Sequence, residues 1–286
     1  MSNNNIKHGV LYFHQGWTDI INGLSLINYY CEKYDNIYLL IRKNAHNIID
    51  FYTKNINNIK LVYLEKYILD SNGCGQGLNY SEGWISNSEN NLLNFVKNKF
   101  NIIEKIDKLY IGGHDLMRDD EYKGVFTRNY YRDDNFCKLF YTSYNIPYET
   151  RISHFKFERD LILENKIYTQ FTQKYGDKYI LYHNMGDTTV RKENGGKAFD
   201  VSIIENPHNF PTVNLDNISA VIFDFIKVLE NAIEIHLLDS FWGVFIYLLD
   251  AKYKLFKNKK ITLYVKRGYY KMFTEPVKLD NWIIKP

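Results

Sequence analysis

Apolar runs and stretches of helical periodicity alternate along the first half of the chain. Runs at 9–13, 37–41, 59–64 and 108–111 have the length of buried strands, and helical patterns lie at 18–33, 45–54 and 89–100. In the first helical pattern, Ile20, Leu24, Ile27 and Cys31 recur at spacings of three and four residues, which marks one buried face. This alternation predicts parallel strands joined by crossover helices.

The second half repeats the alternation. Helices are predicted at 134–144, 159–174, 217–229 and 240–249, and strands at 179–183, 199–204, 234–238 and 253–256. We therefore expect an α/β chain with mainly parallel sheets and two Rossmann-like domains, an N-terminal domain of residues 1–150 and a C-terminal domain of residues 151–286.

Residues 70–87 interrupt the pattern of the first half. They are rich in Ser and Asn and contain Gly73, Gly75, Gly77 and Gly83, which predicts a long loop. Loops of this length in a compact domain are often functional. Two interpretations stay open, a mobile lid or wall of a binding site and a disordered insertion.

The composition narrows the class of protein. The 286 residues include 36 basic and 33 acidic side chains, and a net charge of +3 is too balanced for binding to duplex nucleic acid. Cys31, Cys74 and Cys137 form no CxxC pair, so neither a disulfide framework nor a zinc site is indicated. The first residues have no apolar signal core, and no apolar run is long enough to span a membrane. We expect a soluble cytoplasmic protein.

The end of one predicted strand is a candidate site for a diphosphate. The strand at 234–238 leads through Asp239 and Ser240 into a helix that begins with Phe241 and Trp242. Free amides and the positive end of the helix dipole favour an anion at such a position. Ser240 could cap this helix and also donate its hydroxyl proton to a phosphate, or it could serve only as the N-cap.

A second predicted strand, at 179–183, ends in similar polar residues. His183 and Asn184 follow it directly, and a glycine-bearing loop with Arg191 comes next. Imidazole and guanidinium groups can hold a departing diphosphate, although a solvated loop explains these charges equally well. Because parallel strands end at one edge of a sheet, we expect these residues to face the Ser240 turn.

The turn after the first predicted strand contains candidates for proton transfer. A hydroxyl is a poor nucleophile at neutral pH, and a neighbouring carboxylate or imidazole assists by taking its proton. Asp19 and His14 are the candidates, although the helix dipole alone favours an acidic residue in a first helical turn. Trp17 and His114 are the candidates for contact with the molecule that bears this hydroxyl.

From about residue 110 onward, the sequence resembles a known family. The residues that carry the resemblance are Phe140-Tyr141, Ile146-Pro147-Tyr148-Glu149, Arg151, Phe155, Phe157, Arg159-Asp160, Glu164, His183-Asn184, Arg191, 229–232, 234–241, 254–256 and Asp280-Asn281-Trp282. Their pattern is similar to a glycosyltransferase-like family of bacteria, phages and large DNA viruses. The first half resembles this family only through residues 16–19 and 22–24.

The resemblance implies the GT-B fold of metal-independent glycosyltransferases, with two facing Rossmann-like domains. In that fold the second domain holds a nucleotide-sugar donor and the first holds the acceptor, and members often build surface glycans. The resemblance further implies donor contacts for His183, Arg191, Ser240 and Phe241, and the role of general base for Asp19.

The chain departs from this family at two positions. Asn184 follows His183 where the family often has aspartate. The first turn contains Trp17 and Thr18 where Gly-x-Gly-Asp is usual, and these bulkier residues work against a close backbone approach to a ligand.

Several familiar signatures are absent from the sequence. No two aspartates are separated by one residue, so the Asp-x-Asp metal clamp of the other main glycosyltransferase architecture is missing. There is no GxxxxGK phosphate loop, and the glycines at 73–77 lack GxGxxG spacing. The cluster of His114, Asp115, Asp119, Asp120 and Glu121 could bind a divalent ion, but its contiguity suits a solvated loop better. We expect neither a metal nor a cofactor.

Three functions are therefore compared. The leading hypothesis is sugar transfer from a nucleotide-sugar donor to a hydroxyl of a glycan acceptor. The second is a non-catalytic nucleotide-sugar or glycan-binding protein of the same fold. The third is a single-stranded nucleic-acid binder that uses the many tyrosines and lysines, but no RNP-like aromatic motif supports it. We expect a nucleotide-sugar and a glycan as partners, and no nucleic acid.

Overall fold

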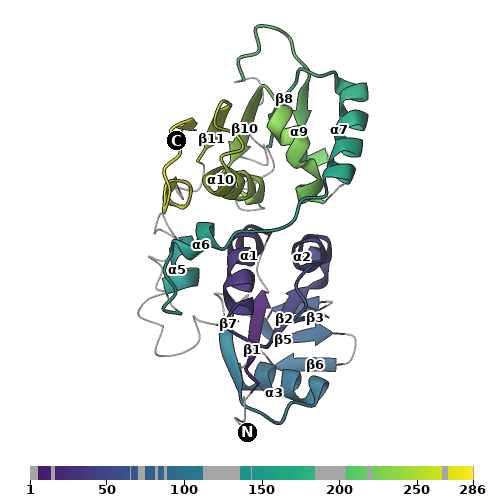
Figure 1. The fold of residues 1–286 in the computed structure, drawn as a ribbon, viewed down its shortest axis with the longest axis vertical. Coiled ribbons are helices and arrows are strands. Elements are labelled where there is room, and N and C mark those ends of the chain that lie inside the picture. The colour runs from purple at the N-terminus through teal and green to yellow at the C-terminus, as the bar shows by residue number, and fades with distance from the viewer. Residues whose placement is uncertain are drawn as a thin grey trace. The chain divides into compact units, whose positions relative to one another are not determined.

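The computed structural model describes residues 6–13, 17–64, 66–69, 75–80, 83–86, 89–111, 136–142, 144–183, 204–217, 221–265 and 270–285. The chain divides into two compact units, one of Met1–Tyr131 and Cys137–Phe157 and the other of Arg132–Phe136 and Glu158–Pro286. Each unit contains a parallel sheet with associated helices (Figure 1), which confirms the predicted α/β class. None of the helices in the described residues is long and apolar enough to cross a lipid bilayer.

The first unit is built on a four-stranded parallel sheet in the order β3-β2-β1-β7. Its strands are β1 (His8–Phe13), β2 (Asn36–Arg42), β3 (Ile59–Leu64) and β7 (Ile106–Ile111). All four were predicted from their apolar runs. The chain passes from β1 to β2 and β3 and then returns to β7 on the other side of β1, so the strand order reverses between β1 and β7.

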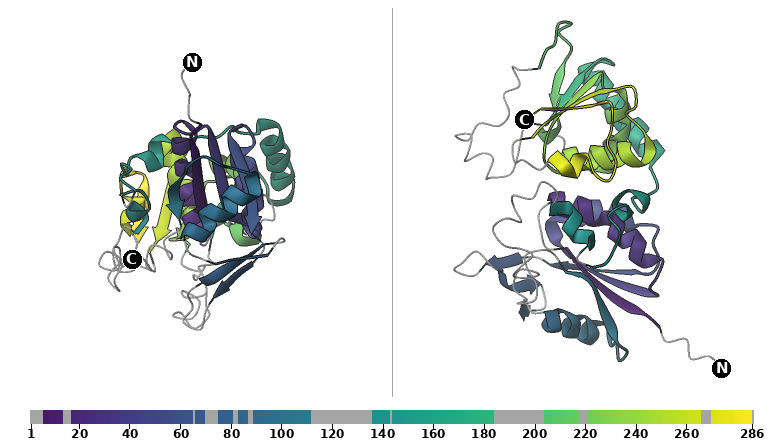
Figure 2. Two further views of the ribbon diagram at one scale, coloured as in Figure 1. Left: turned by 90° about the horizontal axis from the view of Figure 1, so that it is seen from below. Right: turned by 90° about the vertical axis from the view of Figure 1, so that its left-hand side faces the viewer.

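Helices cover both faces of this sheet (Figure 2). α1 (Trp17–Cys31) and α2 (His46–Thr53) lie on one face and α3 (Glu89–Phe100) on the other, and the unit also contains η1 (Lys43–Ala45), α5 (Phe136–Thr142) and α6 (Thr150–Ser153). Alternate strand residues form the core on the α3 side, including Val10, Tyr12, Tyr38, Leu40, Val62 and Leu64, which pack with Val96. This alternation follows from the two-residue repeat of a strand.

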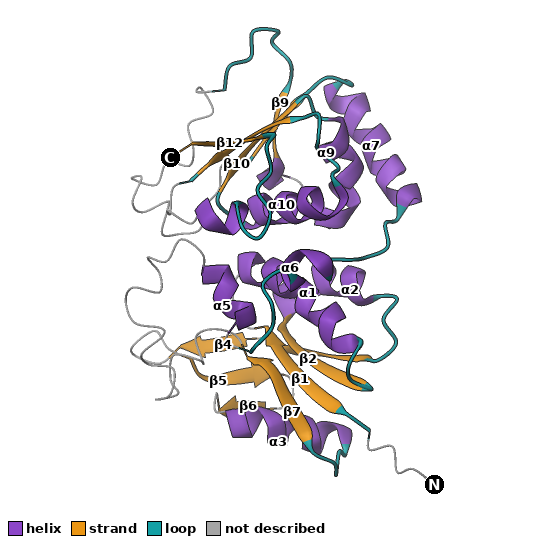
Figure 3. Ribbon diagram, turned by 60° about the vertical axis from the view of Figure 1, so that its left-hand side comes forward, coloured by secondary structure: helices purple, strands orange, loops and turns teal. Residues whose placement is uncertain are grey.

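The predicted loop at 70–87 was wrong in part. A small antiparallel sheet, visible as short arrows in Figure 3, is formed by β4 (Lys66–Leu69), β5 (Gly75–Tyr80) and β6 (Gly83–Ser86). The glycines, serines and asparagines favour turns, but a strand pairs through its backbone, and pairing with β4 satisfies these backbone groups. Residues 70–74, 81–82 and 87 lie outside the described part of the chain.

The second unit is built on a five-stranded sheet in the order β12-β11-β10-β8-β9, with every pair parallel. Its strands are β8 (Ile180–Tyr182), β9 (Thr212–Asn214), β10 (Glu234–Leu238), β11 (Lys260–Tyr264) and β12 (Trp282–Lys285). The predicted strands at 179–183 and 234–238 are confirmed as β8 and β10. β9 was missed because three residues are too few for a recognisable pattern.

The helices of this unit include α7 (Leu161–Tyr175), α9 (Ile226–Asn231) and α10 (Phe241–Tyr253), with 3-10 turns η4 (Leu215–Asn217), η5 (Ile222–Phe225) and η6 (Tyr270–Phe273). The single helix predicted at 217–229 is therefore wrong: the structure has η5 and α9 after an extended Val221 (φ −62°, ψ 132°). Of the strand predicted at 199–204, residues 199–203 lie outside the described chain.

The strand predicted at 253–256 was also wrong. α10 continues to Tyr253 and ends at Lys254, which adopts the left-handed conformation (φ 58°). Phe256 is fully buried, as the apolar pattern suggested, but it lies in a turn whose amide donates to Asp250 Oδ1 at 3.0 Å. Phe256 is therefore buried by a turn and not by a strand. The next strand, β11, begins at Lys260.

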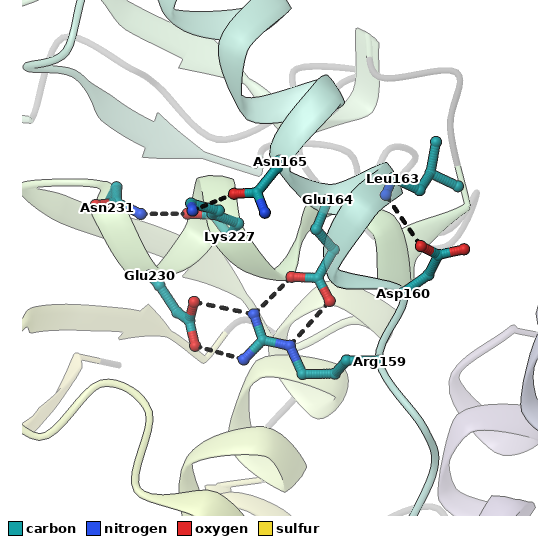
Figure 4. A network of polar contacts seen from close by, with 8 residues as sticks. All are labelled: Arg159, Asp160, Leu163, Glu164, Asn165, Lys227, Glu230 and Asn231. Carbon is teal, nitrogen blue, oxygen red and sulfur yellow. Dashed lines mark hydrogen bonds and ion pairs between the residues drawn. The ribbon is translucent and has the colours of Figure 1, made fainter.

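Several residues that carry the family resemblance stabilise the second unit. Arg159 donates to both carboxylate oxygens of Glu164, from Nε at 2.8 Å and Nη2 at 2.5 Å, and also binds Glu230 from Nη1 at 2.7 Å (Figure 4). Asp160 caps α7 by accepting from the amide of Leu163 at 3.0 Å. These contacts fix the start of α7 against α9, so this part of the motif has a structural role.

Candidate functional site

The carboxyl edge of the second sheet contains a topological switch point between β8 and β10. The two strands are neighbours, but the chain continues from β8 to β9 on one side and from β10 to β11 on the other. In open parallel sheets, ligands bind outside the strand ends at such a point. The residues that follow β8, β9 and β10 therefore form the candidate site.

His183 follows β8 and is fully buried. Its amide donates to the carbonyl of His236 at 2.9 Å, which extends the pairing of β8 with β10. Its ring lies between two other strand ends: Nδ1 is hydrogen-bonded to Ser240 Oγ at 2.8 Å. Nε2 lies 3.0 Å from Asp216 Oδ1, within ion-pair distance but without the geometry of a hydrogen bond. The structure thus brings His183 and Ser240 together, as the sequence predicted.

Ser240 connects β10 to α10. It is extended (φ −137°, ψ −171°), 8% exposed, and its side chain makes no capping hydrogen bond to its own helix. Ser240 therefore occupies the predicted N-cap position, but the expected capping by its side chain is wrong, because the hydroxyl is bonded to His183 instead. Its carbonyl accepts from the amide of Val244 at 2.9 Å, so α10 begins immediately after it. The first-turn amides of α10 have no partner inside the helix.

A glycine in the first turn allows α10 to approach β10 closely. A Cβ on Gly243 would lie 2.6 Å from the carbonyl oxygen of Leu238, a backbone atom that cannot move aside. Gly243 was not among the residues singled out from the sequence, although a glycine at such a place can mark a close approach of two backbone segments. This close packing places Ser240 at the strand end.

The other predicted donor residues at this edge differ in exposure. The Phe241 ring meets the His183 ring edge-on, with centroids 5.5 Å apart. Trp242 is 2% exposed and packs against Phe241 and Phe245, so its ring belongs to the core. Asp239 is 4% exposed. Their roles in donor binding stay predictions.

Asp216 is the residue of this site that sequence reasoning missed. It lies in η4, directly after β9, where its amide donates to the Asn214 side-chain oxygen at 2.9 Å. Burial raises the pKa of the nearby Tyr182 hydroxyl, and the Asp216 carboxylate adds to the rise. Because β9 itself was not recognised, no pattern placed Asp216 beside His183.

In the first unit, Asp19 and Trp17 lie in the first turn of α1, after the carboxyl end of β1. This end belongs to the pair β1 and β7, where the strand order reverses. Trp17 is 38% exposed, and Asp19 is half-buried. His14 and His114, and in the second unit Asn184 and Arg191, lie outside the residues that the structure describes.

A buried arginine supports this end of α1. Arg151 is fully buried, and its Nε donates to Asn22 Oδ1 at 2.9 Å while Nη1 donates to the Tyr148 hydroxyl at 2.9 Å. Burial raises the pKa of the Cys137 thiol to about 12, Arg151 opposes this rise, and Asp19 adds to it. Asp19 and Arg151 therefore act on the same buried neighbourhood.

Within the described ranges, no three His, Cys, Asp or Glu side chains are grouped so as to hold a metal ion. The acidic cluster at 114–121 lies outside these ranges. Metal independence stays a prediction from the sequence.

The chain matches no protein-family model and no curated protein sequence. Among solved structures it is similar to the glycosyl transferase family 9 protein from Veillonella parvula DSM 2008. The two share 9% sequence identity with a TM-score of 0.43, over 97% of this chain and 85% of that chain. This is a distant likeness, and no site residue is assigned from it.

Proposed function

We propose that the protein is a metal-independent glycosyltransferase that moves a sugar from a nucleotide-sugar to a hydroxyl of a glycan acceptor in the cytoplasm. The observation that supports this most directly is the contact of His183 with Ser240 at the switch point of the second sheet. Donor binding is assigned to that edge, and acceptor binding to the carboxyl end of β1 in the first unit.

In the proposed reaction, the acceptor oxygen forms a bond to the anomeric carbon as the bond from that carbon to the diphosphate breaks. Asp19 accepts the proton of the acceptor hydroxyl. The leaving diphosphate gains negative charge, which the Ser240 hydroxyl and the first-turn amides of α10 stabilise. Arg191 would add a further positive charge, as the sequence predicted.

The proposal is tested by thermal shift with EDTA present, using UDP-glucose, GDP-mannose, ADP-glucose and the free nucleoside diphosphates. One nucleotide or nucleotide-sugar should stabilise the protein, and Ser240→Ala and Arg191→Ala should each abolish most of the shift. Thr169→Ala on the exposed face of α7 is the matched control and should keep the full shift. Indifference to every nucleotide would contradict the proposal.

A further inference from the structure

Arg151 on α6 lies against the first turns of α1, and several contacts hold it there. The Ser25 hydroxyl donates to the Arg151 carbonyl at 2.7 Å, and Arg151 Nε donates to Asn22 Oδ1 at 2.9 Å. Nη1 donates to the Tyr148 hydroxyl at 2.9 Å, and Cζ lies 5.7 Å from the centroid of that ring. Asn22, Ser25 and Arg151 are all fully buried, so the guanidinium has a fixed place.

This place is beside the turn of α1 that carries Asp19. Asp19 and Asn22 are three residues apart on α1, and side chains at this spacing are neighbours on the surface of a helix. The Asn22 side chain also leans back toward the first turn, because its Nδ2 donates to the Thr18 carbonyl at 2.9 Å. Its Oδ1, and with it the bound guanidinium, therefore lies near Asp19.

The described groups around this guanidinium differ in charge. On α5, burial raises the pKa of Cys137 and of Tyr141, so both side chains are neutral at ordinary pH. Tyr148 offers a neutral hydroxyl. Asp19 is the acid among these described groups, and its charge and that of Arg151 act in opposite directions on the Cys137 thiol. An acid of this kind favours a buried cation, because the opposite charge offsets the loss of water.

We infer that Arg151 is the positioning residue of Asp19: its buried charge keeps the Asp19 carboxylate ionised at neutral pH and restricts the rotation of that side chain. Asp19 is half-buried, and the loss of water favours the protonated form of a carboxyl group. A protonated carboxyl group cannot take a proton from a hydroxyl, whereas a nearby cation favours the ionised form. The inference rests on the proposed function in one respect, that Asp19 there takes the proton of the acceptor.

The inference is tested by NMR on the full chain with ¹³C in the aspartate carboxyl groups. Asp19 is identified by the signal lost in Asp19→Asn. We expect Asp19 of the wild type to stay ionised down to about pH 4, and a protonation midpoint above about pH 5 would overturn the inference.

Two substitutions of Arg151 separate its charge from the dipole of α1, which also favours an ionised Asp19 but is present in both variants. Arg151→Gln should raise the midpoint of Asp19 by about one pH unit or more. Arg151→Lys keeps the charge and should raise it by less than about half a unit. Equal midpoints in the wild type and a folded Arg151→Gln would overturn the inference, and so would equal shifts in the two variants.

A second measurement needs no substitution of Arg151, because the loss of a fully buried arginine can prevent folding. Hydrogen exchange at Arg151 Nε should become faster by about tenfold or more in Asp19→Asn, since the guanidinium loses a charged partner. The matched control is Asp35→Asn, which removes an acid beyond the other end of α1 and should leave this rate unchanged. An unchanged rate in Asp19→Asn, or an equal acceleration in the control, would overturn the inference.

These measurements need no sugar substrate, so the inference and the proposed function fail separately. An Asp19 midpoint that depends on Arg151, together with no thermal shift by any nucleotide or nucleotide-sugar, would keep the pair of Asp19 and Arg151 and reject the transferase. A thermal shift by a nucleotide-sugar, together with an Asp19 midpoint that is indifferent to Arg151, would keep donor binding and reject the inference.

Discussion

The indole Nε1 of Trp282 donates a hydrogen bond to Asp250 Oδ2 at 2.9 Å, which ties β12 to the last turns of α10. Asp250 is 1% exposed and also accepts from the amide of Phe256. The resemblance residues at 280–282 therefore act in packing.

Replacing Asp250 with alanine should destabilise the second unit strongly. It leaves the Phe256 amide and the Trp282 indole without their acceptor, and a cost of about 3 kcal/mol is expected. Asp250→Asn keeps one acceptor oxygen and should cost roughly half as much. Urea unfolding followed by tryptophan fluorescence measures both. The exposed Asp177→Ala is the control, and an equal loss there would contradict the prediction.

The hydrogen bonds of Arg159 predict that lysine, although it has the same charge, cannot replace this arginine without a loss of stability. Arg159→Lys keeps the charge but loses the paired hydrogen bonds to Glu164 and Glu230, so we expect a loss of about 2 kcal/mol in unfolding free energy. Glu164 is 1% exposed, and Glu164→Gln should therefore cost at least as much. Chemical denaturation checks this, and unchanged stability in Arg159→Lys would show that charge alone suffices.

Two helical glycines should respond differently to alanine. In Gly243→Ala the new methyl meets the Leu238 carbonyl, and a net loss of about 2 kcal/mol is expected despite the better helix propensity. In Gly23→Ala it meets the tip of the Phe13 ring, 2.9 Å away, which can shift. The smaller loss expected for Gly23→Ala can be measured in the same unfolding assay, and the reverse order would contradict the packing argument.

The two described cysteines should resist alkylation. Burial raises the pKa of both Cys31 and Cys137 to about 12, so at pH 8 the thiolate fraction is about a thousandfold below that of a free thiol. Since folding raises these pKa values, they contribute stability below pH 9 that is lost as the pH rises toward 12. Iodoacetamide mass spectrometry, with urea-unfolded protein as control, checks the first expectation. Rapid native labelling of either residue would contradict it.

Asp19→Asn separates catalysis from binding. If Asp19 takes the acceptor proton, the variant should lose about 10²- to 10⁴-fold in kcat and keep the donor-induced thermal shift. Asp35→Asn, beyond the end of α1, is the control and should retain activity. Full activity in Asp19→Asn would remove this residue from the mechanism.

The sequence was sufficient for most of the fold because β1, β2, β3 and β10 are mainly apolar runs of strand length. It failed where local composition and tertiary pairing disagree. β5 contains two glycines and has the composition of a loop, but its backbone pairs with a strand on each side. The apolar run that ends at Phe256 has the pattern of a strand, but Phe256 is buried in a turn.

The candidate site was partly predictable for a similar reason. His183 and Ser240 follow recognisable strands, so parallel topology alone implied that they are close. Asp216 follows a three-residue strand, and its contact with His183 spans loops whose sequence carries no periodic signal.

The return of residues 137–157 to the first unit limits how this protein could be recombined. Ser25 donates to the Arg151 carbonyl at 2.7 Å, and the Arg151 guanidinium is bonded to Asn22, so α1 depends on a segment more than a hundred positions downstream. A chimaera joined before Arg151 would replace part of the first unit with a foreign chain and remove these contacts. A junction immediately after Phe157 would exchange the second unit except for Arg132–Phe136 and leave the contacts of Arg151 with α1 in place.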